Sequence, residues 1–324
     1  MTKLSSTKIY ACGGAAINIT KELKAQQDVL GFSDFTISRM DSSEANLKPG
    51  MPKDTVYTLE GIHGGGKDRA YVYKKAVAAA SQMLSVQPPA DFNIVVFSLS
   101  GASGSTIGPV IISELLRLGL PVTAICIGTH GGLSEARNTV ATLKTFSGIA
   151  QAVKAPIVAS YFEVNQQSDQ KDVDNQVRQR ISSLLNLLDS SNVEVDQKDL
   201  INFFRFTNLH PGTNKLVMLD LFIDEDLKEI GGTSPLAMAT IFKDAERPYL
   251  GVTPDYSATG TRDPNVIDER MQHDVHYVIT DNRSTEIYRH MSERLAALEE
   301  NKKKRGISDS LIEDTETNDD GFVF

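Results

Sequence analysis

Short apolar runs alternate with longer helical repeats through the first half of the chain. The runs are rich in β-branched residues and end at small residues, which is typical of buried strands. The segments between them carry apolar residues at helical spacing, which predicts helices packed against a sheet. This alternation predicts a mostly parallel sheet with helices on both faces. The predicted strands are Lys8–Cys12, Ile37–Asp41, Val56–Glu60, Ile94–Phe97, Pro121–Ile127 and Ala155–Tyr161.

The pattern changes in the second half. An amphipathic helix is predicted over Asp172–Leu188, and a short apolar helix follows over Leu200–Phe206. Fewer helices separate the strands beyond this point, which predicts a smaller α+β region. A last helix is predicted from Ser284 to Arg305, with Gly306 as its C-cap. The later strands are predicted at Lys215–Ile223, Leu236–Phe242, Tyr249–Thr253 and Val275–Thr280.

Composition narrows the class of protein. The chain has 324 residues, 40% of them apolar, which is enough for two domains or one large α/β unit. Its formal net charge of −9 argues against a general nucleic-acid partner. Cys12 and Cys126 lie in apolar strands and indicate neither a disulfide framework nor a zinc site. Without a transmembrane or signal-peptide pattern, we expect no membrane partner and a reducing cytoplasm.

The most informative stretch is Asn93–Pro109. An apolar strand passes into a loop in which most side chains are hydrogen, methyl or hydroxyl, and a helical pattern resumes at Ile107. A strand, a small-residue turn and a helix together point free backbone N–H groups at an anion, and the helix dipole adds to the attraction. A tight turn without a ligand is the alternative, but the density of glycine and hydroxyl residues favours phosphate binding.

Two further glycine loops follow predicted strands. Gly13 and Gly14 open a helix predicted to run to about Gln26. Gly61–Lys67 satisfies the beginning of a P-loop, but Asp68 stands where a Ser or Thr should bind Mg²⁺. A true P-loop is therefore not predicted. The glycines and Lys67 could contact a terminal phosphate from another direction, or form a flexible turn.

Together these loops resemble those of the tubulin and FtsZ superfamily of GTP-dependent filament proteins. Residues 11–18 resemble its first nucleotide loop, and residues 98–106 resemble its signature loop, usually GGGTGSG. Residues 61–68 stand where a γ-phosphate loop belongs, and residues 172–188 stand where a central helix joins two domains. The signature departs from the usual form, with Ser, Ala and Ser at positions 100, 102 and 103 where Gly, Gly and Thr are common.

The divergent signature, short chain, long last helix and acidic tail are similar to phage-encoded tubulins of the PhuZ type. That family forms dynamic filaments that position phage DNA, or the phage nucleus, in a bacterial host. The resemblance implies an α/β fold with a Rossmann-like parallel-sheet GTP-binding domain and a smaller α+β C-terminal domain. The implied parts are a GTP-binding domain at 1–170, the central helix at 171–191, an activation domain with the catalytic loop at 192–282, and a C-terminal helix with an acidic tail at 283–324.

The resemblance also implies GTP or GDP with Mg²⁺ as the bound group. The signature loop would wrap the α- and β-phosphates, and Asp41 would face them through Mg²⁺ and water or simply cap a turn. Asp174 and Asn175 would read the guanine edge. Asp172 or Asp174 could also cap the start of that helix. Glu135 and Arg137 are candidate ribose and phosphate contacts, or solvated residues at a helix start. The implied nucleotide-binding residues are Gly13, Gly14, Ala15, Asn18, Asp41, Gly64, Gly65, Ser100, Gly101, Ala102, Ser103, Gly104, Ser105, Thr106, Glu135, Arg137, Asp174 and Asn175, and none is assigned as a direct metal ligand.

Val195–Asp199 is similar to the NxDxxD catalytic loop of FtsZ, with Glu194 in place of the Asn. By resemblance, Asp196 and Asp199 of one subunit enter the nucleotide pocket of the next and orient the water that attacks the γ-phosphate. The spacing also suits helix capping, which needs no catalysis.

The implied partners are a homopolymer and a C-terminal tail that binds the neighbouring subunit, in the host cytoplasm. Residues 307–324 carry six acids and no Lys or Arg, together with apolar residues that a purely solubilising tail does not need. Two other classes stay open from the residues alone. One is a self-contained nucleotide enzyme, either a Rossmann oxidoreductase or a divergent P-loop NTPase, although GxGxxG is missing. The other is a nucleotide-dependent scaffold that does not hydrolyse.

Overall fold

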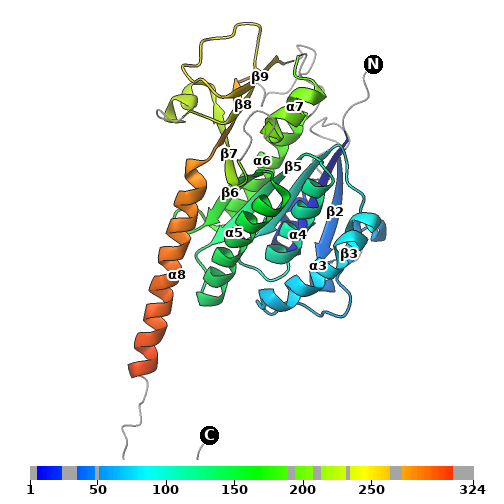
Figure 1. Cartoon of the computed structure of the whole chain (residues 1–324), viewed down its shortest axis with the longest axis vertical. Coiled ribbons are helices and arrows are strands. Elements are labelled where there is room, and N and C mark those ends of the chain that lie inside the picture. Colours follow the sequence, from blue (N-terminus) through cyan, green and yellow to red (C-terminus); the bar gives the residue numbers. More distant parts are fainter. Residues whose placement is uncertain are drawn as a thin grey trace, which may run out of the picture.

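In the part of the chain that the structure describes, ten strands form one continuous sheet, which Figure 1 shows from one side. The computed structural model describes residues 6–23, 35–47, 51–188, 194–206, 213–230, 234–262 and 272–308. The strands are β1 (Thr7–Cys12), β2 (Phe35–Asp41), β3 (Val56–Thr58), β4 (Phe92–Ser98), β5 (Val122–Thr129), β6 (Ile157–Val164), β7 (Leu216–Ile223), β8 (Ala237–Phe242), β9 (Tyr256–Thr261) and β10 (Val275–Thr280). Their order in the sheet is β3-β2-β1-β4-β5-β6-β7-β10-β8-β9.

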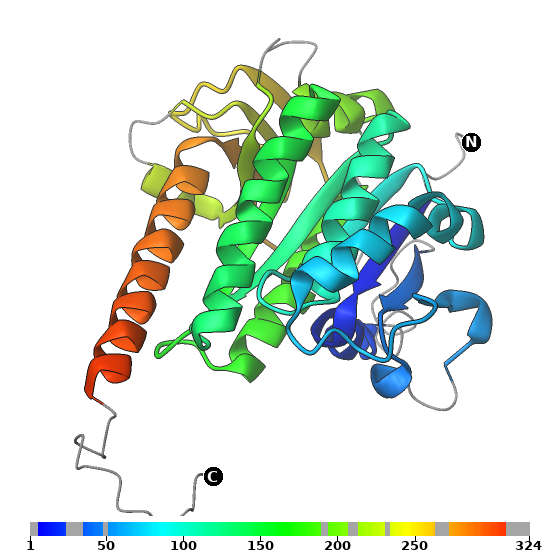
Figure 2. The ribbon, with the colours of Figure 1, turned by 60° about the horizontal axis from the view of Figure 1, so that its bottom comes forward.

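Helices cover both faces of this sheet. They are α1 (Gly13–Thr20), α3 (Arg69–Val86), α4 (Gly104–Arg117), α5 (Leu133–Val153), α6 (Gln170–Leu188), α7 (Gln197–Phe204) and α8 (Asn282–Ser308). Alternate residues of β4 enter two separate cores, with Val95 and Phe97 on one face and Ile94 and Val96 on the other. Figure 2 shows α3, α4 and α5 side by side across the first face, with α8 beside α5. The second core contains residues of α1, α6 and α7.

The α/β fold with a mostly parallel first half is confirmed, and the later strands extend the same sheet. β6 pairs in parallel with β7, with Ile157 opposite Leu216. β10 is antiparallel to both β7 and β8, while β9 is parallel to β8. The boundary between the two parts, at the central helix α6, stays a prediction.

Three sequence expectations were wrong in detail. Residues Tyr249–Thr253 form no strand, because Gly251 turns the chain with φ +70°, and the strand lies instead at Tyr256–Thr261. Helix α1 ends at Thr20, short of Gln26. Helix α8 continues through Gly306 to Ser308, since one glycine in a helix costs only about 1 kcal/mol relative to alanine. The predicted acidic tail falls mainly on residues 309–324, outside the described residues.

The carboxyl ends and the amino ends of the parallel strands carry different groups. The loops after β1, β3, β4 and β5 lie at the carboxyl ends of parallel strands, where open α/β sheets bind ligands. Helix α7 packs at the amino ends, where the ring of Phe204 lies 6.2 Å from that of Phe92, the first residue of β4. Within the described part of the chain, no helix is both long and apolar enough to cross a bilayer.

Candidate functional site

The first loop and the signature loop meet backbone to backbone. Gly13 has φ +81°, and a Cβ there would lie 2.7 Å from the Gly104 nitrogen. A Cβ on Gly104 would in turn lie 2.9 Å from the carbonyl oxygen of Cys12. Only glycine permits this approach at either position. The contact brings the beginnings of α1 and α4 together at the carboxyl edge.

These two helices begin without a side-chain cap. Neither Cys12 before α1 nor Ser103 before α4 accepts a hydrogen bond from its helix through its side chain. By contrast, Asp68 caps α3 and Asp196 caps α7. The first N–H groups of a helix lack the usual partner one turn earlier. In α4 the Thr106 N–H donates to the Ser103 carbonyl at 3.2 Å, which leaves the earlier N–H groups of α4, and those at the start of α1, for an anion at this edge. Asp68, which spoils the P-loop pattern, serves as an N-cap.

The third glycine loop joins the same cluster. The Gly64 N–H donates to the carbonyl of Ser42 at 3.0 Å. A Cβ on Gly65 would overlap the Cβ of Ala102, so this loop packs directly on the signature loop. The hydroxyls of Ser42 and Ser103 lie 2.5 Å apart and share a hydrogen bond. The structure therefore brings together three loops that sequence analysis identified separately.

Asp41 is buried beneath these loops and holds a turn. Asp41 is only 1% exposed, and its Oδ1 accepts a hydrogen bond from the Ser42 N–H at 2.7 Å. Oδ2 accepts from the Asn46 amide at 2.9 Å, and that amide lies over Gly14. The capping role is thus present, while a link to Mg²⁺ stays a prediction.

Hydroxyls of the signature loop are used inside the protein more than was expected. Thr106 Oγ1 donates to the carbonyl of Ala102 at 2.8 Å, and Ser105 Oγ reaches the same carbonyl at 3.4 Å. Ser98 and Ser100 bond to each other at 2.9 Å. Because these hydroxyls have internal partners, the loop offers a ligand chiefly its backbone N–H groups. At Gly101 a Cβ would meet no atom within 4 Å, so the loop has an open side there.

Glu135 and Lys67 close one side of the cluster. Lys67 Nζ lies 3.1 Å from Glu135 Oε1, and the Gly132 N–H donates to Oε2 at 2.7 Å. Burial opposes ionisation of Glu135, but these two partners outweigh it, so the pKa of Glu135 lies below its ordinary value. Asn138, which sequence analysis missed, donates to the carbonyls of Lys67 and Ser100 at 3.1 and 2.9 Å. Its signal was a polar residue on the apolar face of the helix.

Arg137 does not join the loops. Its guanidinium pairs with Glu299 of α8, with Nη2 3.0 Å from Oε1. Glu135 and Arg137 are two positions apart on α5, and side chains at that spacing do not face the same way. The geometry therefore gives the predicted phosphate contact of Arg137 no support.

The predicted guanine-reading residues lie where α6 begins beside α1. Arg178 pairs with Glu22 at 3.2 Å and donates to the Asn175 side chain at 2.5 Å. Asn18 is exposed on α1, four residues before Glu22, which lies just beyond the end of that helix. Burial raises the pKa of Asp174, and the Arg178 cation only partly offsets this. Ala15 is exposed on the same helix.

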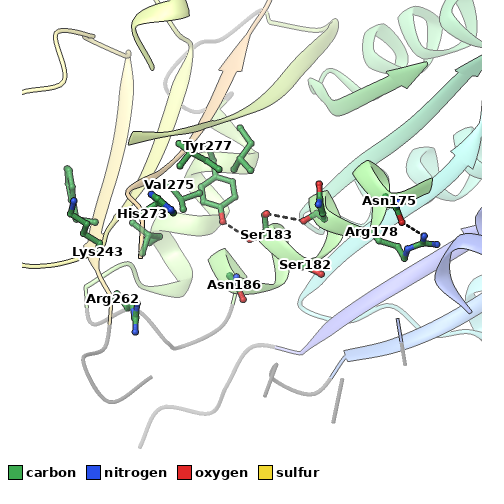
Figure 3. A pocket seen from close by; sticks show the side chains of 15 residues that line it. Asn175, Arg178, Ser182, Ser183, Asn186, Lys243, Arg262, His273, Val275 and Tyr277 are labelled. Atoms are coloured by element: carbon green, nitrogen blue, oxygen red, sulfur yellow. Dashed lines mark hydrogen bonds between the residues drawn. The ribbon is translucent and has the colours of Figure 1, made fainter. Parts of the chain in front are cut away.

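A cavity of about 570 Å³ lies between α6 and the strands β7, β8 and β10 (Figure 3). Of the predicted nucleotide-binding residues, only Asn175 lines it. Its lining is basic and partly apolar, with Arg178, Lys243 and Arg262 beside aliphatic residues of the strands. The cavity is therefore separate from the phosphate loops, and its chemistry suits an acidic, partly apolar group.

Asp196 and Asp199 form a capping box at the start of α7. The Asp199 N–H donates to Asp196 Oδ1 at 2.9 Å, and the Asp196 N–H donates to Asp199 Oδ2 at 3.2 Å. Tyr256, another residue that sequence analysis missed, donates to Asp199 Oδ1 at 3.0 Å. Burial and this carboxylate raise the pKa of Tyr256 to about 12. The capping interpretation is correct, and it leaves both carboxylates at the surface with lone pairs to spare.

The two aspartates and the glycine loops cannot meet within one chain. The signature loop follows the last residue of β4, and the other two glycine loops pack on it. The last turn of α7 packs at the first residue of β4. β4 has seven residues. At about 3.3 Å per residue, its ends are about 20 Å apart. Any site that uses both groups must therefore combine two chains.

Comparison with known proteins identifies the family. No family model matches the chain. A phage tubulin-like protein of Pseudomonas phage PhiPA3 is 30% identical over 322 residues, covering 98% of both chains. A solved protofilament of TubZ from bacteriophage PhiKZ is 27% identical, with a TM-score of 0.85 over 98% of this chain and 99% of that one. The phage tubulin PhuZ with GDP has the same fold, with a TM-score of 0.84, 21% identity, and coverage of 98% and 99%. This chain belongs to the phage tubulin-like proteins.

Proposed function

We propose that this protein is a GTPase that assembles into filaments and completes its hydrolytic site between subunits. One observation carries the proposal: the glycine loops lie at the carboxyl ends of the parallel strands, whereas the helix that begins with Asp196 and Asp199 packs at the amino ends. In a head-to-tail polymer, the α7 end of one subunit would cover the loop end of the next. The similar PhiKZ TubZ forms a protofilament and the similar PhuZ binds GDP, which supports this reading.

Nucleotide binding would use mainly backbone groups. The uncapped starts of α1 and α4 would donate to the α- and β-phosphates, and the open side at Gly101 gives a phosphate room to approach. Gly64, Gly65 and Lys67 would lie toward the terminal phosphate. Mg²⁺, when bound, would neutralise phosphate charge, and Asp41, buried beneath the loops, would be the carboxylate that holds its water shell.

Hydrolysis would depend on the next subunit's Asp199. Each oxygen of its carboxylate has one internal donor, so each retains a lone pair for water. A carboxylate that holds and partly deprotonates water is sufficient for phosphoryl transfer, which mainly needs positioning. Tyr256 and Asp196 would fix the orientation of that carboxylate.

Guanine selectivity would come from the junction of α1 and α6. A carboxylate at Asp174 can accept from N1–H and the 2-amino group, which adenine lacks. The Asn18 and Asn175 amides would add donors and acceptors. The raised pKa of Asp174 fits a functional group kept in a partly desolvated place.

In the cell, we infer that the filaments turn over in the cytoplasm of the infected bacterium and position phage DNA or the phage nucleus. The acidic tail would bind a neighbouring subunit. The cavity of Figure 3 has the matching chemistry, with cations of Arg178, Lys243 and Arg262 beside apolar strand residues. Charge would supply selectivity and the apolar residues would supply buried area.

Competition and pelleting test this proposal together. We expect GTP and GDP, but not ATP, to displace a bound fluorescent guanine nucleotide, and Mg²⁺ to strengthen binding of GTP. Pellets should form with GTP and a non-hydrolysable analogue but not with GDP. Equal competition by ATP would contradict the guanine site. Turnover without any polymer would favour the self-contained nucleotide enzyme instead.

A further inference from the structure

Three potential metal ligands from distant parts of the chain meet beside α8. His130 follows β5, Glu163 lies on β6, and His290 lies on α8. One ligand atom from each lies within 4.8 Å of the other two. His130 Nε2 is 3.3 Å from Glu163 Oε1, and the rings of His130 and His290 are 5.8 Å apart. Neither nucleotide binding nor the hydrolytic proposal uses this cluster.

One of the three separations already matches that of tetrahedral zinc ligands, and the other two are within 4.8 Å. With zinc–ligand bonds of about 2.0–2.2 Å, neighbouring ligand atoms in a tetrahedron lie about 3.3–3.6 Å apart. His130 and Glu163 already have that spacing. His290 is exposed on a helix, so rotation of its side chain could shorten the remaining distances. Two histidines and one carboxylate form a known three-ligand set for zinc with one position left open.

The surroundings hold the two inner ligands in place. The backbone N–H of His130 donates to the backbone carbonyl of Val164 at 3.0 Å. This bond continues the pairing of β5 with β6 and fixes His130 beside Glu163. The Tyr161 hydroxyl donates to Glu163 Oε1 at 2.9 Å, as an outer-sphere partner of a ligating carboxylate does. His130 Nε2 is shielded from water and has no hydrogen-bond partner among the described residues. A metal ion would satisfy this nitrogen.

One cationic side chain lies near this cluster and would repel a bound metal ion. Arg294 lies one turn beyond His290 on α8, and its Nη2 donates to the Gly131 carbonyl at 2.8 Å. That bond directs the guanidinium at the loop backbone. Two neutral histidines, one carboxylate and a divalent ion together carry a single net positive charge, so the added repulsion is limited. The alternative without a metal is an ion pair of protonated His130 with Glu163.

We propose that His130, Glu163 and His290 bind one divalent transition-metal ion, with zinc as the best fit. The ion would join α8 to the β5–α5 loop and to β6. Both cysteines of the chain are buried elsewhere and take no part. The loop that carries His130 continues to Gly132, whose N–H holds Glu135. The metal would thus connect the long helix to the edge of the nucleotide loops.

Metal titration of the full-length, nucleotide-free protein tests the proposal. Zinc alone should bind at one ion per chain, and cobalt should give the strong visible absorption of a tetrahedral site. His290→Ala and Glu163→Gln should each weaken zinc binding at least tenfold, and zinc should raise the melting temperature of the wild type but of neither variant. His290 is exposed, so its variant should fold, which circular dichroism can verify.

His273→Ala is the matched control. His273 is also a histidine beside a carboxylate, with Nδ1 2.5 Å from Asp224 Oδ2, but it belongs to no three-ligand cluster among the described residues. This variant should bind zinc as the wild type does. Zinc binding by the wild type no stronger than by His290→Ala, or equal weakening by His273→Ala, would overturn the proposal and leave the ion pair as the role of His130 and Glu163.

Discussion

Two glycines of the signature loop differ in what a methyl group would meet. A Cβ at Gly104 would press on the Cys12 carbonyl at 2.9 Å, whereas a Cβ at Gly101 would meet open space. The first position is filled by the protein itself. The second is empty, and we propose that the phosphates approach the loop there. Alanine at the two positions therefore separates folding from ligand binding.

Gly104→Ala should lower the free energy of unfolding by about 1–3 kcal/mol, because the loops must move apart. Gly101→Ala should leave stability nearly unchanged and weaken GTP binding about tenfold, equivalent to about 1.4 kcal/mol. Denaturant unfolding and nucleotide titration measure the two effects. GTP binding by Gly101→Ala at wild-type strength would place the phosphates elsewhere.

Asparagine separates the two roles of Asp196 and Asp199. Asn caps a helix about as well as Asp, so Asp196→Asn and Asp199→Asn should both fold and assemble. Loss of the charge should slow GTP hydrolysis by about 10²–10⁴-fold, giving filaments that persist. Asp196→Ala is the control, since loss of the cap should cost about 1 kcal/mol of stability. Wild-type turnover by Asp199→Asn would leave capping as its only role.

We expect ionised Asp174 to destabilise the folded protein while it provides selectivity for guanine. A carboxyl whose pKa is raised on folding makes the folded state bind more protons, so stability falls as pH rises through the ordinary and then the raised pKa. Asp174→Asn should therefore raise the melting temperature near pH 7 and not near pH 3. Its preference for GTP over ATP should fall about tenfold. An unchanged nucleotide preference would remove Asp174 from the guanine site.

Among the elements, those with a strong local signal were predicted and those set by distant partners were not. The buried strands of the first half were found because runs such as Ile94–Phe97 are continuously apolar. Strand β9 was missed because its sequence alternates small and polar residues, and its parallel pairing with β8 decides its conformation. Tyr256 was missed with it. The internal use of the Ser105 and Thr106 hydroxyls and the Arg137–Glu299 pair depend on contacts that spacing does not reveal.

The extent of helix α8 defines which residues a test of the tail should delete. Its 27 residues extend about 40 Å. Its buried residues Ile287 and Met291 lie in the first half and Glu299 still pairs with Arg137, so only the part beyond Glu299 projects from the body (Figure 1). Because α8 includes Ile307 and Ser308, deletion of residues 309–324 leaves the helix complete. We expect the truncated protein to bind GTP normally and to assemble only at a concentration several-fold higher.

A charge-neutral tail is the control for length. Replacing its six acids by Asn or Gln keeps the apolar residues, and should raise the critical concentration in low salt almost as much as deletion. Light scattering measures both variants. Normal assembly by the truncated protein at low and moderate salt would show that the tail does not bind a neighbour. The replaced acids are Asp309, Glu313, Asp314, Glu316, Asp319 and Asp320.

For the whole molecule, the single sheet sets the geometry of the proposed chemistry. β4 runs from the α7 end, where Phe92 contacts Phe204, to the loop end, where Ser98 begins the signature. The two ends of β4 are about 20 Å apart, so the loop end and the α7 end of one monomer stay separated. The family resemblance implied each half-site and its completion by the next subunit. The order and direction of the strands give the physical reason, because they put the two groups at opposite ends of β4.

The most direct test is GTP turnover per subunit as protein concentration rises through the threshold for assembly. We predict negligible turnover below the threshold and a steep rise above it, with Asp199→Asn assembling at the same threshold but remaining inactive. Turnover per subunit that is the same at every concentration, including dilutions in which no polymer forms, would contradict a site completed by two chains.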